Sequence, residues 1–260
     1  MKYENILYEK SEGIATITIN RPNVLNALNM QALQEISSSL DDAEEDETVK
    51  VIVITGAGDR SFTTGLDLKA IKGLSPLDAM NQDLLGQKLT KKIEELKKPV
   101  IAAINGYALG GGLELAMSCD LRIASENARL GQTELNVGLI PGWGGTQRLP
   151  RLVGRGIAQE LIFTGKMIDA ATAKQLGLLS TVVPPDKLKS AVKELASELM
   201  AKSPVGTQLV KQLINSSLEI DLTRGLVQEA QAFGILVSTE DFNEGVAAFI
   251  EKRKPKFTGK

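Results

Sequence analysis

The sequence predicts an α/β protein that ends in a helical C-terminal region. Strand-like and helix-like segments alternate over roughly the first 200 residues, as in proteins whose helices pack on a largely parallel sheet. Beyond about residue 200 only amphipathic helical segments follow. The 260 residues are 43% hydrophobic, which is enough for a large buried core in one domain with an appendage.

The elements of the first half follow from hydrophobic periodicity. Alternating or continuous β-branched residues predict strands at 14–19 and 49–54, and the spacing of apolar residues at 30–45 predicts an amphipathic helix. The same reasoning then predicts a helix at 77–96, a strand at 100–104 after Pro99, a short helix at 111–117 and a strand at 121–124.

The second half is predicted to be mainly helical from about residue 156. One strand is expected at 179–183, before two prolines, and helices are expected at 188–200, 204–217, 223–237 and 239–251. We therefore divide the chain into a core domain, residues 1–200, and a helical region, residues 201–260. The apolar faces of that region are expected to contact another subunit.

Composition excludes several classes of chemistry. The chain has no histidine and a single cysteine, Cys119, so a Ser-His-Asp triad, a histidine-ligated metal and an intramolecular disulfide cannot form within it. Acid–base chemistry must therefore fall to carboxylates, lysine, tyrosine or that cysteine. We expect no metal site, and the lone cysteine favours a reducing compartment.

Charge and hydropathy bound the partners. The net charge of −2 gives no basic surface for nucleic acid, and the basic tract at 252–256 is interpreted as a solvated tail that could still meet a phosphate. Residues 1–5 lack the apolar core of a secretory signal. The apolar window 99–119 contains Asn105, Glu114 and several glycines, so it is not expected to span a membrane. We predict a cytoplasmic protein.

Two stretches, residues 105–114 and 131–134, carry the candidate chemistry. Three successive glycines open a predicted helix whose unpaired N–H groups favour a developing negative charge, and Glu114 follows them. Glu134 supplies a second carboxylate. Residues 61–68 follow a neighbouring strand, so a backbone N–H from each loop could bind one oxygen. The combination suits addition or removal of water beside a carbonyl, although either glycine cluster alone could simply relieve crowding in a turn.

A nucleotide site is the competing interpretation of the glycines. Residues 56–61 follow a strong strand and imitate a dinucleotide fingerprint, but Ser61 stands where the third glycine or alanine is required. Gly165-Lys166 lacks the hydroxyl residue and the preceding glycine of a P-loop. We interpret both as turns.

Residues 21–28, 62–68, 105–114, 131–147 and 249–255 together resemble successive signatures of the enoyl-CoA hydratase/isomerase, or crotonase, superfamily. The resemblance extends over nearly the whole chain. It implies the crotonase (ClpP-like) fold, a spiral of repeated ββα units with a C-terminal helical trimerisation region. It also implies homotrimers, or homohexamers built as dimers of trimers.

The resemblance assigns roles to individual residues. The backbone N–H groups of Leu66 and Gly111 would form an oxyanion hole for a thioester oxygen. Glu114 would activate a water, Glu134 would protonate the α-carbon, and the Gly142 N–H would help to hold the water. Catalysis would need no metal and no redox cofactor. Coenzyme A would be part of the substrate and not a separate cofactor.

The resemblance also implies contacts with the acyl-CoA thioester. Trp143 is expected to border the acyl pocket or to pack in the core, and Asp67 to order the oxyanion loop. The expected CoA-binding residues are Asn26, Ala27, Leu28, Thr64, Gly65, Asp67 and Leu68, with Phe249 and Lys252 reaching from a neighbouring subunit. Two departures stand out: Leu66 replaces the usual alanine, and Asn23 stands where a lysine is common.

The sequence therefore predicts reversible syn hydration of a 2-trans-enoyl-CoA to a 3-hydroxyacyl-CoA. The bulk of Leu66 and Trp143 favours a short acyl chain. A double-bond isomerase would use Glu134 alone, and the presence of Glu114 argues against it. A dehydratase or a cyclic-dienoyl-CoA hydratase would use the same two glutamates. A non-catalytic acyl-CoA-binding or RNA-associated member is the alternative from a different class.

Overall fold

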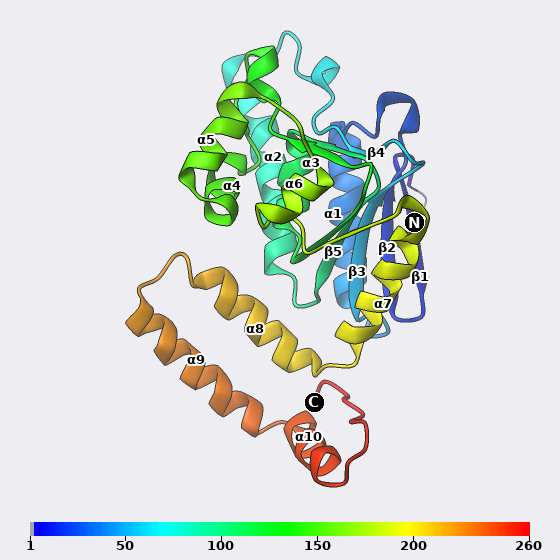
Figure 1. Ribbon diagram of the computed structural model, residues 1–260, viewed down its shortest axis with the longest axis vertical. Helices are drawn as coiled ribbons and strands as arrows, with labels where there is room; N and C mark the ends of the chain where they lie inside the picture. Colours follow the sequence, from blue (N-terminus) through cyan, green and yellow to red (C-terminus); the bar gives the residue numbers. More distant parts are fainter. Residues whose placement is uncertain (1–2) are drawn as a thin grey trace.

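The computed structural model describes residues 3–260, so the first two residues of the predicted core domain lie outside it. Two sheets form the core (Figure 1). The six-stranded sheet has the order β1 (Ile6–Ser11), β2 (Ile14–Ile19), β3 (Val51–Gly56), β5 (Val100–Ile104), β7 (Leu121–Ser125) and β10 (Thr181–Val183). The four-stranded sheet has the order β4 (Ser61–Thr63), β6 (Tyr107–Leu109), β8 (Arg129–Gly131) and β9 (Ile168–Asp169).

Helices surround the sheets and form the C-terminal region. They are α1 (Met30–Glu45), α2 (Pro76–Glu95), α3 (Gly111–Ser118), α4 (Gly145–Val153), α5 (Arg155–Thr164), α6 (Ala170–Gln175), α7 (Leu188–Met200), α8 (Pro204–Ser216), α9 (Leu222–Val237) and α10 (Glu240–Ile250). Short 3-10 turns are η1 (Pro22–Val24), η2 (Leu68–Ala70), η3 (Glu134–Val137) and η4 (Pro185–Lys187).

The chain winds as a spiral, and each turn adds one strand to each sheet. β3, β5 and β7 pair in parallel within the first sheet, while β4, β6 and β8, which follow them in sequence, pair in parallel within the second. A helix then closes each turn: α2, α3 and α4. This arrangement confirms the predicted spiral of ββα units.

Burial on both faces explains the continuous apolar run of β3. Ile52 and Ile54 pack into the main core, whereas Val51 and Val53 belong to a second cluster beneath α7. A strand covered on both faces does not alternate in polarity, because neither face meets water. The main core is closed on its other side by α1, which buries Ile36 and Leu40.

The predicted elements recur with small shifts at their ends, but the second sheet was not predicted. Its strands have only two or three residues, too short to produce a period in the sequence. The strand expected at 179–183 is confined to Thr181–Val183, and residues 145–175 contain three helices that were not separately predicted.

The helices α8, α9 and α10 extend away from the sheets (Figure 1). The residue at which we divided the chain, 200, is the last of α7, and α8 begins at Pro204 after the Ser203 cap. Large apolar side chains on these helices and on the loop between α8 and α9 are exposed: Val210, Ile214, Leu218, Leu222, Leu226, Val227, Phe233, Ile235, Phe249 and Ile250. Among the described residues, no helix is long and apolar enough to cross a membrane.

A buried lysine fastens α8 to the core. Lys211 is 8% exposed, and its Nζ lies 2.9 Å from Asp120 Oδ2 and donates to the Ile93 and Lys98 carbonyls at 2.9 and 3.3 Å. Asp120 also accepts the Val100 N–H at 2.7 Å. All three ammonium protons therefore have acceptors, as a buried charge requires.

Removing one partner of this pair would leave a buried charge unpaired. We expect Lys211→Ala to lower the free energy of unfolding by about 3–5 kcal/mol, measured by chemical denaturation. Lys193→Ala, which breaks the exposed pair with Glu12, is the matched control and should cost at most about 1 kcal/mol. Equal effects of the two substitutions would contradict this account of the buried pair.

Candidate active site

Two backbone N–H groups point into one site from different loops. Within residues 3–260, neither the Leu66 nor the Gly111 N–H donates to a protein acceptor. The loop that carries Leu66 lies against the start of α3: a Cβ on Gly65 would be 2.6 Å from the Gly111 nitrogen. Gly65 also has a φ of +80°, a backbone conformation that residues with a side chain rarely adopt. The pair of free donors suits one negatively charged oxygen.

The Leu66 loop is held by its neighbours on both sides. The Leu28 N–H donates to the Gly65 carbonyl at 2.7 Å, and the Asp67 N–H donates back to Leu28 at 2.9 Å. Arg21 forms an ion pair with Asp67 at 3.3 Å and also binds the Ala27 carbonyl. Asp67 accepts the Lys69 N–H as well. Asp67 therefore orders this loop, through a cation that the sequence analysis did not identify.

Several predicted CoA-binding residues lie inside the fold. Asn26 is fully buried, and its side chain accepts the Arg21 N–H and donates to the Ala57 and Ser61 carbonyls. Leu28 and Ala27 are buried too. Any contact that these three residues make with a ligand must use backbone atoms. Thr64 is half-buried and Leu68 is exposed, so their side chains are accessible.

Glu114 is a buried carboxyl on α3 with no cationic partner among the described residues. It is 1% exposed, and its Oε1 accepts the Gly145 N–H at 2.6 Å. Burial raises its pKa to about 8, the negative charges of Glu134 and Asp83 add to that effect, and the Gly145 N–H opposes it. This carboxyl exchanges protons near neutral pH.

Glu134 begins η3 and faces the first turn of α3. A Cβ on Gly110 would lie 3.2 Å from its Oε1 and would crowd it, and the φ of +53° at Gly110 also favours glycine. The Gln132 amide, turned so that its nitrogen faces the carboxylate, donates to Oε1 at 2.8 Å. Burial raises the pKa of Glu134 to about 7. The two glutamates thus flank the free N–H groups with pKa values close to neutrality.

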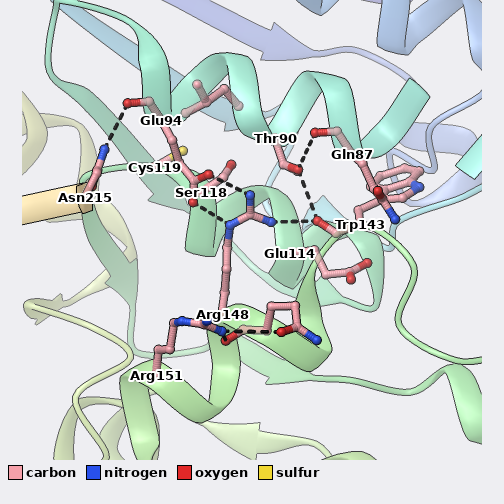
Figure 2. A network of polar contacts seen from close by, with 12 residues as sticks. Gln87, Thr90, Glu94, Glu114, Ser118, Cys119, Trp143, Arg148, Arg151 and Asn215 are labelled. Carbon is pink, nitrogen blue, oxygen red and sulfur yellow. Dashed lines mark hydrogen bonds and ion pairs between the residues drawn. The ribbon is translucent and has the colours of Figure 1, made fainter. Parts of the chain in front are cut away.

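The loop at 141–145 completes the site and is fixed by a polar network (Figure 2). Arg148 binds Glu94 through two nitrogens, at 2.6 and 2.8 Å, and donates to the Trp143 carbonyl at 2.7 Å. Thr90 donates to the same carbonyl at 3.1 Å. These contacts hold the Gly145 N–H in front of Glu114.

Trp143 is packed in the core. It is 2% exposed, and a Cβ on Gly86 or on Gly111 would collide with its ring. Of the two roles considered for it, packing behind the Gly111 amide is the one that this burial supports.

The C-terminal residues are not brought to this site within one chain. Phe249 is 85% exposed, and Lys252 follows α10 with a φ of +55°. Figure 1 shows α10 at the opposite end of the molecule from α3. A role for these two residues at the site would require a second copy of the chain.

Four side chains near the site were missed from the sequence: Arg21, Gln132, Arg148 and Asp83. Arg21 and Gln132 lie within stretches already singled out and Arg148 directly follows one, so their polarity was an available signal. Asp83 lies in a helix among other polar residues, so its sequence context does not distinguish it.

Comparison with known proteins is consistent with this geometry. A profile of the enoyl-CoA hydratase/isomerase family matches residues 9–260. A protein of Syntrophomonas wolfei named crotonyl-CoA hydratase is 46% identical over the full length of both chains. A short-chain-enoyl-CoA hydratase of Clostridium acetobutylicum is 46% identical over 98% of this chain and 97% of its own.

Solved structures agree on the fold. The crystal structure of an enoyl-CoA hydratase from Bacillus anthracis superposes with a TM-score of 0.95 at 40% identity, covering 99% of this chain and 100% of that one. An enoyl-CoA hydratase subunit from Geobacillus kaustophilus gives 0.94 at 39% identity over the whole of both chains.

The buried Glu114 carboxyl has a consequence for stability. Its pKa is about 8 in the folded chain against an ordinary 4.5, so the unfolded state releases this proton at lower pH than the folded state. Burial of the Glu114 carboxyl therefore destabilises the folded state increasingly from about pH 4.5, and the effect is complete above about pH 8. We expect Glu114→Gln to be more stable than wild type, by a margin that grows across this range. Denaturant unfolding as a function of pH measures it, and a margin independent of pH would contradict the burial argument.

Proposed function

The chain belongs to the enoyl-CoA hydratase/isomerase family, and we propose that it is an enoyl-CoA hydratase that adds water reversibly to a 2-trans-enoyl-CoA. The product is a 3-hydroxyacyl-CoA. One observation carries the proposal: two carboxyl groups with pKa values of about 7 and about 8 flank a pair of free backbone N–H groups. The names of the relatives support the same reaction.

The two N–H groups bind the thioester carbonyl oxygen in this proposal. Addition at the β-carbon moves negative charge onto that oxygen, and the Leu66 and Gly111 N–H groups stabilise the resulting enolate. A single donor of this kind is worth roughly a hundred- to a thousandfold in rate. The positive end of the α3 dipole, at Gly111, acts in the same sense.

The glutamates carry the proton transfers. Glu114 takes a proton from water as the water oxygen bonds to the β-carbon, and Glu134 gives a proton to the α-carbon, so one water is added in all. The pair must hold a single proton, so activity is expected to be highest between about pH 7 and about pH 8.

The alternatives lack a comparable observation. Isomerisation needs a single carboxylate, yet Glu114 is buried beside the site and bonded to Gly145. A non-catalytic acyl-CoA-binding role gives no reason to keep two carboxyl groups at a cost in burial. Dehydration is the reverse of the proposed reaction at the same site.

We propose a short, linear acyl group as the preferred substrate, which the names of both relatives support. Leu66 is half-buried, and its side chain packs against the main hydrophobic core. For the CoA moiety we propose the exposed and half-buried part of the same loop, at 64–68, together with the Ala27 backbone. No separate cofactor is proposed.

We also propose a cytoplasmic homotrimer or homohexamer. The exposed apolar residues of α8, α9 and α10 support such an assembly, because monomers rarely leave so many on one region. It would bring Phe249 and Lys252 of one copy towards the CoA of the next. Light scattering should give three or six times the chain mass of 27.9 kDa, and a monomer at micromolar concentration would refute this assembly.

The activity is tested with crotonyl-CoA through loss of the absorbance of its conjugated thioester. We expect Glu114→Gln and Glu134→Gln each to lower kcat by about a hundred- to ten-thousandfold, because each removes one proton transfer. Glu126→Gln, at an exposed position, should retain full activity. Full hydration by both active-site variants would disprove the mechanism, and deuterium incorporation without hydration would favour isomerisation.

A further inference from the structure

A third carboxylate lies beside the two glutamates, and the mechanism above leaves it unused. Asp83 is on α2, and its Oδ1 lies 2.0 Å from the position that a Cβ on Gly142 would take. Its carboxylate therefore fills the space of a side chain at position 142. Gln87, one turn further along α2, donates to Asp83 Oδ2 at 3.2 Å and to the Gly142 carbonyl at 2.7 Å. The carboxylate is thereby held against the loop that positions Glu114.

Asp83 has no counter-charge in the described part of the chain. Among residues 3–260, burial raises the pKa of four carboxyl groups: Asp83, Glu114, Asp120 and Glu134. Asp120 is paired with Lys211, whereas the other three form no ion pair within the described chain. Those three surround the loop at 141–145 and the first turn of α3. A half-buried, unpaired carboxylate costs stability, and its coincidence with the two glutamates points to a role at this site.

We propose that Asp83 is a positioning residue for the hydration, whose negative charge keeps the shared proton on the glutamate pair and makes Glu114 a stronger base. This inference rests on the proposed function. A like charge nearby disfavours ionisation, and the charge of Asp83 adds to the effects of burial and of Glu134 in raising the pKa of Glu114. The charge then tunes the reaction without touching the substrate.

The other charges around Glu114 leave room for this effect. Glu134 faces it from η3 and acts in the same direction. From α4, the guanidinium of Arg148 is bound to Glu94 and to the Trp143 carbonyl. The rest of α3 has no ionisable side chain. The charge of Asp83 on α2 can therefore be removed without deleting either glutamate or any member of the Arg148 network.

The first test is the pH profile of kcat/KM with crotonyl-CoA. In Asp83→Asn the alkaline limb of the profile should move to lower pH. The ratio of kcat/KM for the variant to kcat/KM for wild type should therefore fall by about twofold or more as the pH rises from about 6 to about 9. Asp83→Glu, which keeps the charge, should return the profile towards that of wild type. Glu95→Gln removes an exposed charge from the same helix and should leave the profile unchanged. A ratio that is constant with pH would show a purely structural role and overturn the proposal.

The second test does not need turnover. Infrared titration of the intact protein follows the band of the protonated Glu114 carboxyl, which is identified by its loss in Glu114→Gln. The midpoint of that band should move to lower pH in Asp83→Asn and stay in place in Glu95→Gln. An unchanged midpoint overturns the inference even if the enzyme hydrates crotonyl-CoA. A shifted midpoint without any hydration would support the role of Asp83 and refute the proposed function.

Discussion

The site depends on direct backbone contact between the loop after β4 and the first turn of α3. A Cβ on Gly112 would lie 2.1 Å from the Thr63 carbonyl oxygen, and one on Gly65 would lie 2.6 Å from the Gly111 nitrogen. Only glycine permits this approach. Because the two loops touch through main chain, the two free N–H groups lie close together. Thr63 reinforces the contact by accepting the Gly65 N–H and donating to the Asn26 carbonyl.

The same close packing isolates Glu114 from water. Its carboxyl lies behind the loop at 141–145, which Arg148, Glu94 and Thr90 hold in place. Burial that is costly for folding thus produces a group that exchanges a proton near neutrality. Helix α2 takes part twice along a single face, since Thr90 and Glu94 anchor the loop and Arg148, and Asp83, three turns before Glu94, lies against Gly142. The electrostatics of the site therefore depend on a helix that has no part in the glycine-rich motif.

Sequence reasoning located the long helices and strands and the motif residues. It missed features that depend on contacts between parts of the chain that are distant in the sequence. β3, β5 and α1 have clear periods, and Gly111 and Glu114 stand in a distinctive stretch. The short strands of the second sheet have no period to detect. Asn26 stays a predicted CoA contact, which its backbone would have to make because its side chain is spent on three backbone partners. Asp83 gives no local signal, because its significance comes from Gly142, which is distant in the sequence.

The Lys211 contact bears on how the chain is made. Asp120 precedes its partner by 91 residues, so the ribosome exposes the carboxylate well before the lysine is synthesised. At translation rates of about 5–20 residues per second this interval lasts roughly 5–18 seconds. During that time the end of α2 and the start of β5 surround a carboxylate that lacks its cation. The buried pair therefore cannot form until α8 emerges.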